Sequence, residues 1–247
     1  MEKGKINMKD IKKQSEWTQS RTLFYIGLFA AILVFIGDWM LGYGVKQANL
    51  SGLEGKLSTY MGKTDSVYLC SALFGLIGIV LEGLSYFGIY RLVKKESLKY
   101  ARRLRIGIIG YLAFGACGVH VPCVMAAWLY SFLRTENPGI AYECVRKFAV
   151  YFMVPAIILF TIFCLYLIVV QIYIFAKGMT PYPRWCWVFN IGVGMAVTMA
   201  IATPFRGYAW GNALAAAWIS VGNIWQFLGL LLIMNRLQKQ RLEYNEK

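Results

Sequence analysis

Three ionisable side chains, Asp38, Glu82 and His120, interrupt otherwise apolar stretches of the sequence. Burying a carboxylate or an imidazole in such a stretch is energetically unfavourable, so each is a functional-site hypothesis by default. These are also the groups that enzymes use as general acid and base, because burial and neighbouring charges tune their proton affinity. We therefore predict that Asp38, Glu82 and His120 form an acid–base site.

The elements that must position these side chains are long apolar segments. Apolar residues make up 58% of the 247 residues and charged residues only 15%, which is typical of multi-pass membrane proteins. Six runs are each long enough to cross about 30 Å of hydrocarbon as a helix. The first run starts near residue 22, and the other five cover 67–93, 106–133, 149–176, 186–204 and 211–234. We predict an all-α bundle of six transmembrane helices (22–234) between a basic tail (1–21) and a C-terminal tail (235–247).

The basic residues predict the orientation of this bundle. Nineteen of the 26 Lys and Arg residues fall in the two tails and in the loops after the second and fourth runs. By the positive-inside rule, both termini face the cytoplasm and the protein lies in the cell membrane. Because these bases flank apolar runs, we attribute the net charge of +14 to topology and contact with membrane lipids, and predict no nucleic-acid partner.

Helix geometry places the polar groups at similar depths. Counted from the nearest predicted cytoplasmic base, Asp38, His120, Asn223 and Glu82 lie about 25, 22, 20 and 14 Å into the membrane. We predict that amides near them orient a substrate, as amides do in oxyanion sites; for Asn190 and Asn223, hydrogen bonds between helices are the alternative. These amides are Asn190, Asn212, Asn223 and Gln226.

Arg206 is the only base in the loop between the fifth and sixth runs. It is predicted either to pair with Asp38 or to bind an anionic head group, with an interfacial anchor as the alternative. Asp38 then lies nearest the outer mouth of the site, and His120 with Glu82 forms the chemical pair.

The cysteines give no sign of a metal centre. The six cysteines contain no Cys-x-x-Cys pair and the chain has one histidine, so we predict no structural zinc and no cofactor. A metal ion held by Asp38, Glu82 and His120 is the one alternative left open.

The order of these elements resembles a family of bacterial multi-span membrane proteins classed as a domain of unknown function. The shared pattern begins with Gly37-Asp38 in the first run, Glu82 in the second and His120 in the third. It continues with Pro183-Arg184-Trp185 and Asn190 around the start of the fifth run, and Gly222-Asn223 in the sixth. The resemblance implies an architecture and a set of residues, and no reaction.

Three functions are consistent with this residue set. The first is a membrane-embedded acid–base enzyme that binds a small amphipathic or lipid-like ligand. The second is a small transporter or proton-coupled permease that uses the same groups as a relay. The third is a non-catalytic structural or sensor subunit, in which the polar groups only join helices.

Overall fold

The computed structural model describes residues 8–245, with side chains described from 15 to 240. Within that range every regular element is a helix, which confirms the predicted all-α class. The outermost residues of both predicted tails, 1–7 and 246–247, lie outside the described part. The remainder of the basic tail is not separate from the bundle, because its backbone belongs to the first helix, α1 (Met8–Gly42).

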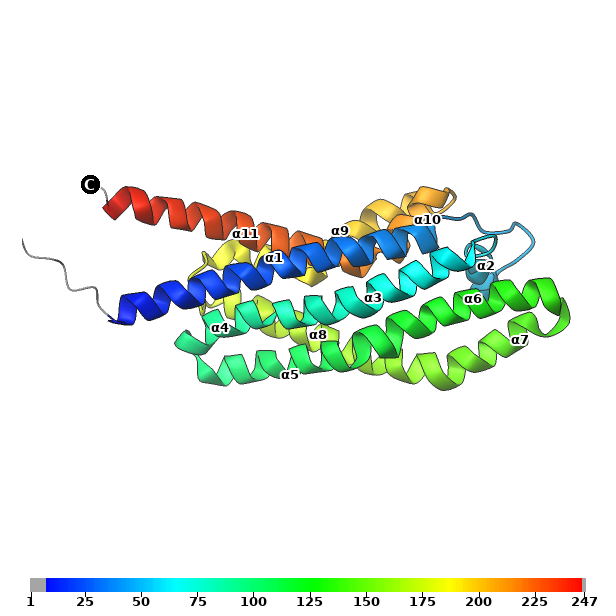
Figure 1. The fold of residues 1–247 in the computed structure, drawn as a ribbon, viewed down its shortest axis with the longest axis horizontal. Coiled ribbons are helices and arrows are strands. Elements are labelled where there is room, and N and C mark those ends of the chain that lie inside the picture. Colours follow the sequence, from blue (N-terminus) through cyan, green and yellow to red (C-terminus); the bar gives the residue numbers. More distant parts are fainter. Residues whose placement is uncertain (1–7, 246–247) are drawn as a thin grey trace, which may run out of the picture.

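The helices run side by side along one axis (Figure 1). Helix α3 (Asp65–Ser85) continues into α4 (Phe87–Glu96), and α5 (Leu98–Phe114) continues through the π-helix η1 (Gly115–His120) into α6 (Val121–Glu136). Helix α7 (Pro138–Phe148) continues through a second π-helix, η2 (Ala149–Met153), into α8 (Val154–Ala176). The start of α1, the α4–α5 junction and the end of α11 (Trp218–Asn245) lie at one end, which we call the basic end.

Within the described part of the chain, five helical stretches are long and apolar enough to cross a membrane. They cover Ser15–Gly42, Asp65–Glu96, Leu98–Glu136, Pro138–Ala176 and Trp218–Gln240. The predicted fifth run is instead broken into the 3-10 helix η3 (Arg184–Val188), α9 (Ile191–Ala202) and η4 (Thr203–Phe205). Pro183 and Pro204 limit it, because proline lacks the backbone N–H that a helix interior needs. The predicted sixth run likewise divides into α10 (Ala209–Ala216) and α11.

The distribution of polar and apolar side chains is reversed relative to a soluble domain. Large apolar side chains face outward, with Phe29 65% exposed and Val169 64% exposed, whereas Glu82 and Asn223 are completely buried. A soluble protein places such residues the other way round. Several of these helices are therefore compatible with a lipid environment, which suggests a membrane location.

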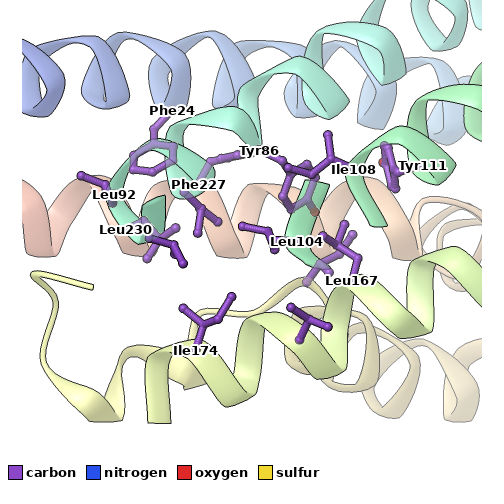
Figure 2. Packing of buried hydrophobic residues seen from close by; sticks show 14 of the residues in the cluster. Phe24, Tyr86, Leu92, Leu104, Ile108, Tyr111, Leu167, Ile174, Phe227 and Leu230 are labelled. Carbon is purple, nitrogen blue, oxygen red and sulfur yellow. The ribbon is translucent and has the colours of Figure 1, made fainter. Parts of the chain in front are cut away.

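The buried core lies between α1, α4, α5, α8 and α11 (Figure 2). The ring of Tyr86 packs against Phe227 with centroids 5.4 Å apart, and Phe227 packs against Phe24 at 6.3 Å. Glycines let α1 approach the second helical stretch closely: a Cβ on Gly88 would lie 2.6 Å from the Phe24 ring. Small residues at such crossings are typical of helix packing in membranes.

The predicted outer loops fold into helices at the end opposite the basic end. Helix α2 (Gly52–Ser58) lies in the first of them, and α7 with the last residues of α6 replaces the loop predicted after residue 133. Leu57 of α2 belongs to a buried cluster with Tyr130 and Val145. The Tyr130 hydroxyl also donates to Glu54, 3.1 Å away. These contacts hold α2 against the α6–α7 hairpin.

Candidate functional site

Asp38 and His120 form the first of two buried polar clusters. His120 Nδ1 lies 3.5 Å from Asp38 Oδ1, and the Ser220 hydroxyl donates to Asp38 Oδ2 at 2.8 Å. The side chains of Asp38 and His120 are 15% and 10% exposed. Three segments distant in sequence, the end of α1, η1 and α11, therefore meet at one carboxylate.

The second ring nitrogen of His120 fixes where the protons of this cluster lie. His120 Nε2 is 2.9 Å from the backbone carbonyl oxygen of Ser71. A carbonyl only accepts hydrogen bonds, so Nε2 carries a hydrogen and Nδ1 faces Asp38. The imidazole is therefore held between a backbone acceptor and the carboxyl group of Asp38.

Local helix geometry aims His120 at Asp38. His120 is the last residue of η1, and Pro122 follows two residues later. Proline lacks an N–H and its ring collides with the carbonyl four residues earlier, which favours a widened turn. The same spacing recurs in η2, where Pro155 follows Met153 by two residues. A π-turn shifts the following residues around the helix axis, and such turns are frequent at functional sites.

Gly75 of α3 provides the space for the imidazole. A Cβ at this position would lie only 2.0 Å from His120 Nε2 and Cδ2. No residue larger than glycine can occupy the site without displacing the ring. The position of His120 therefore depends on α3 as strongly as on its own helix.

Glu82 anchors the second cluster, a chain of hydrogen bonds between completely buried side chains. The Tyr86 hydroxyl donates to Asn223 Oδ1 at 2.7 Å, and Asn223 Nδ2 donates to Tyr111 Oη at 2.9 Å. The Tyr111 hydroxyl then donates to Glu82 Oε2 at 2.7 Å. Every donor in this chain points toward the carboxyl group. Glu82 Oε1 has no hydrogen-bond partner among the described residues.

The two clusters are neighbours, although they are not paired as predicted. Gly75, beside the imidazole, and Glu82 are seven residues apart on α3, or about 10 Å along the axis. The expected His120–Glu82 pair is not formed, because His120 contacts Asp38 and Glu82 is held by Tyr111. Arg206 is exposed after η4, and the described partners of Asp38 are His120 and Ser220 instead.

The predicted amides, other than Asn223, bind backbone groups. Asn190 Oδ1 accepts from the Gly192 N–H at 2.8 Å and caps α9. Asn212 Nδ2 donates to the Gly44 carbonyl at 2.8 Å, which joins α10 to the segment after α1. Gln226 Oε1 accepts from the Ile191 N–H at 2.9 Å. Asn190 Nδ2 also donates to the Ile168 carbonyl at 3.5 Å, so each of these three side chains joins segments that are distant in sequence.

Three members of the two clusters are absent from the predicted site. These are Tyr86, Tyr111 and Ser220. Tyr86 lies one turn beyond Glu82 on the same helix, a spacing that puts both on one face. Tyr111 lies only five residues, about 7.5 Å, inside the third run, a depth that does not distinguish it from a belt residue. The position of Tyr86 was therefore the available signal.

The geometry does not bring the three predicted acid–base groups onto one metal position. Among the residues whose side chains are described, no group of three His, Cys, Asp or Glu is arranged to hold a metal ion. Asp38 and His120 meet, whereas Glu82 Oε2 is engaged by the Tyr111 hydroxyl. The arrangement instead supports proton transfer and hydrogen bonding.

Fold and site together define a class: an all-helical protein with several helices apolar enough for a membrane and buried ionisable groups between them. Within this class, residues 8–237 match the model of the family of unknown function DUF6796. The chain belongs to this family, which confirms the resemblance to an uncharacterised domain family. Comparisons with curated proteins and with solved structures gave no match.

Proposed function

We propose that this protein is a multi-pass protein of the cell membrane that binds a small amphipathic ligand beside Asp38 and His120 and exchanges a proton with it. The observation that carries the proposal is the position of the imidazole. One ring nitrogen is fixed by the Ser71 carbonyl and the other faces a carboxyl group. This arrangement supports a membrane-embedded acid–base enzyme, because an imidazole and a carboxyl group held side by side are the groups that act as general acid and base.

The proposed topology has six membrane-crossing segments, with the interrupted η3–α9–η4 stretch as the fifth. Its support is that α1 begins and α11 ends at the same end of the molecule (Figure 1), which requires an even number of crossings. The concentration of Lys and Arg at that end supports a cytoplasmic location for both termini. Non-helical backbone within a membrane is tolerated where protein encloses it.

Thiol labelling tests this orientation. Cys144 is exposed on α7, at the end opposite the basic end. A membrane-impermeant maleimide added to intact cells should label the wild-type protein, and Cys144→Ser should remove the labelling. Labelling that appears only after the cells are opened would contradict the proposed orientation.

A lipid-conversion assay tests the acid–base proposal. Purified protein is incubated with a membrane lipid extract, and the products are identified by mass spectrometry. Asp38→Asn and His120→Gln should abolish any new product while the protein remains folded. Asp65→Asn is the matched control, since Asp65 is an exposed carboxylate at the start of α3. Conversion that survives both site variants would refute the proposed roles.

The buried hydrogen-bond chain favours proton-coupled transport as a second candidate function. Tyr86, Asn223, Tyr111 and Glu82 link three helices. The two hydroxyl groups and the carboxyl group of this chain can exchange protons, and the amide of Asn223 orients the hydroxyls. In proteoliposomes, an imposed pH gradient should then drive solute uptake that Glu82→Gln eliminates. If all these variants lose only thermal stability, the polar groups are structural, and both proposals fail.

A further inference from the structure

A pocket of about 680 Å³ opens at the basic end, between α1 and α4. Its volume falls within the range of small-molecule sites, about 300–1,000 Å³. It lies on the other side of Tyr86 from the Asp38–His120 cluster along the α3–α4 stretch, so it is separate from the proposed acid–base site. The pocket is lined by Glu16, Phe87, Tyr90, Arg91, Lys94 and Lys95.

One face of α4 supplies most of this lining. Positions 87, 90, 91, 94 and 95 follow the spacing i, i+3, i+4, i+7 and i+8, which places them on one side of a helix. The two aromatic residues come first, nearer the middle of the bundle, and the three bases follow toward its end. Ile89, Leu92 and Val93, on the opposite face, are buried in the core. An aromatic wall thus leads to a cluster of positive charge.

The neighbouring helix orients two of the three bases. Lys95 Nζ lies 3.1 Å from Glu16 Oε2, and the Arg91 guanidinium donates to the Gln19 side chain, both partners being on α1. Lys94 has no ion-pair or hydrogen-bond partner among the described residues. Among the described lining residues one carboxylate therefore faces three bases, which leaves a positive charge that a ligand can neutralise.

We propose that this pocket binds the phosphate group of an anionic amphipathic molecule. Arg91 and Lys94 hold the phosphate, since a guanidinium matches its oxygens with paired donors and an ammonium adds a point charge. The apolar part of the ligand lies along Phe87 and Tyr90. A membrane phospholipid head group and a soluble phosphate ester share this chemistry.

Titration calorimetry of the full-length protein in neutral detergent tests the proposal. The probes are dioctanoyl phosphatidic acid, dioctanoyl phosphatidylcholine and glycerol 3-phosphate. Phosphatidic acid should bind most tightly, because it combines the higher charge with the apolar part. Weak or no binding of glycerol 3-phosphate identifies the source as a lipid, and equal binding identifies soluble esters. Failure of phosphatidic acid and glycerol 3-phosphate to bind would overturn the proposal.

Matched charge variants distinguish a pocket from general attraction to basic residues. Loss of each base should weaken binding about fivefold, so the double variant Arg91→Gln with Lys94→Gln should weaken it about 25-fold. Lys99→Gln with Arg102→Gln removes the same charge from exposed positions of α5 at the same end, and should change binding less than about threefold. Equal losses in the two double variants would refute the pocket.

A third variant should change phosphate binding in the opposite direction. Glu16→Gln removes the carboxylate that competes for Lys95, so phosphate binding should strengthen, by about twofold to fivefold. Weakened binding in Glu16→Gln would contradict the proposed position of the phosphate. Because none of these residues belongs to the two buried clusters, the outcome is independent of the acid–base assay.

Discussion

Replacing Gly75 by alanine should separate His120 from Asp38 while both of these residues keep their own side chains. The added Cβ would lie 2.0 Å from the imidazole, and ordinary contact begins at 3.4 Å. The ring must therefore move by at least about 1.4 Å. A displacement of that size removes the 3.5 Å contact with Asp38 and the 2.9 Å bond to the Ser71 carbonyl. The crowding should destabilise the fold by about 1–3 kcal/mol.

Gly78 provides a control for this crowding. A Cβ there would lie 2.4 Å from Val34 Cγ2, so Gly78→Ala crowds the α1–α3 crossing one turn away from Gly75. Both variants should unfold at lower temperature than the wild type. Only Gly75→Ala should lose the function that depends on His120.

The assay exploits the single histidine of the chain. Protein labelled with ¹⁵N-histidine gives imidazole signals from one residue, which NMR follows without further assignment. The Nδ1 signal of Gly75→Ala should leave its wild-type position, as in Asp38→Asn, because both variants lose the contact with Asp38. The Nε2 signal should move in Gly75→Ala alone, because only that variant also loses the bond to the Ser71 carbonyl. Gly78→Ala should keep the wild-type spectrum. A folded Gly75→Ala protein with wild-type signals would refute the proposed dependence of His120 on Gly75.

Other variants test the buried chain and the outer helices. Tyr111→Phe should lower the free energy of unfolding by about 1–3 kcal/mol, because Asn223 and Glu82 each lose a buried partner; unfolding in mixed micelles, followed by tryptophan fluorescence, measures it. By the same method, Glu82→Gln should lower the free energy of unfolding by less than Tyr111→Phe, since the amide oxygen of the new side chain still accepts from Tyr111. A larger loss than in Tyr111→Phe would argue that the carboxyl group itself is needed. Tyr130→Phe removes the bond to Glu54 and should speed proteolytic cleavage of the α2 segment, which gel analysis measures over time. An unchanged cleavage rate would contradict the role of this bond in holding α2 in place.

The apolar runs and their interruptions predict the helical class, and the isolated polar residues predict which side chains lie inside. The pairing of those side chains was beyond the sequence, because it depends on how far each helix rotates. The π-turn before Pro122 changes the rotation of side chains about the helix axis at His120, so that His120 contacts Asp38 instead of Glu82.

The same limit explains the residues that were missed. Tyr111 contacts Glu82 only because α5 and α3 lie at one particular rotation and height. Composition assigns a tyrosine in an apolar run to the membrane interface more readily than to its interior. The fifth run illustrates another limit: hydropathy predicts a continuous span, whereas Pro183 and Pro204 shorten the helix between them to α9.

Helix α11 supplies the Ser220 hydroxyl to Asp38 and the Asn223 amide to Tyr86 and Tyr111. Because Ser220 lies 182 residues after Asp38 in the chain, Asp38 is synthesised long before this partner. Chains that stop before α11 therefore lack these partners for their buried polar groups. We expect quality-control proteases to recognise such chains, which makes completion of α11 a checkpoint in biogenesis.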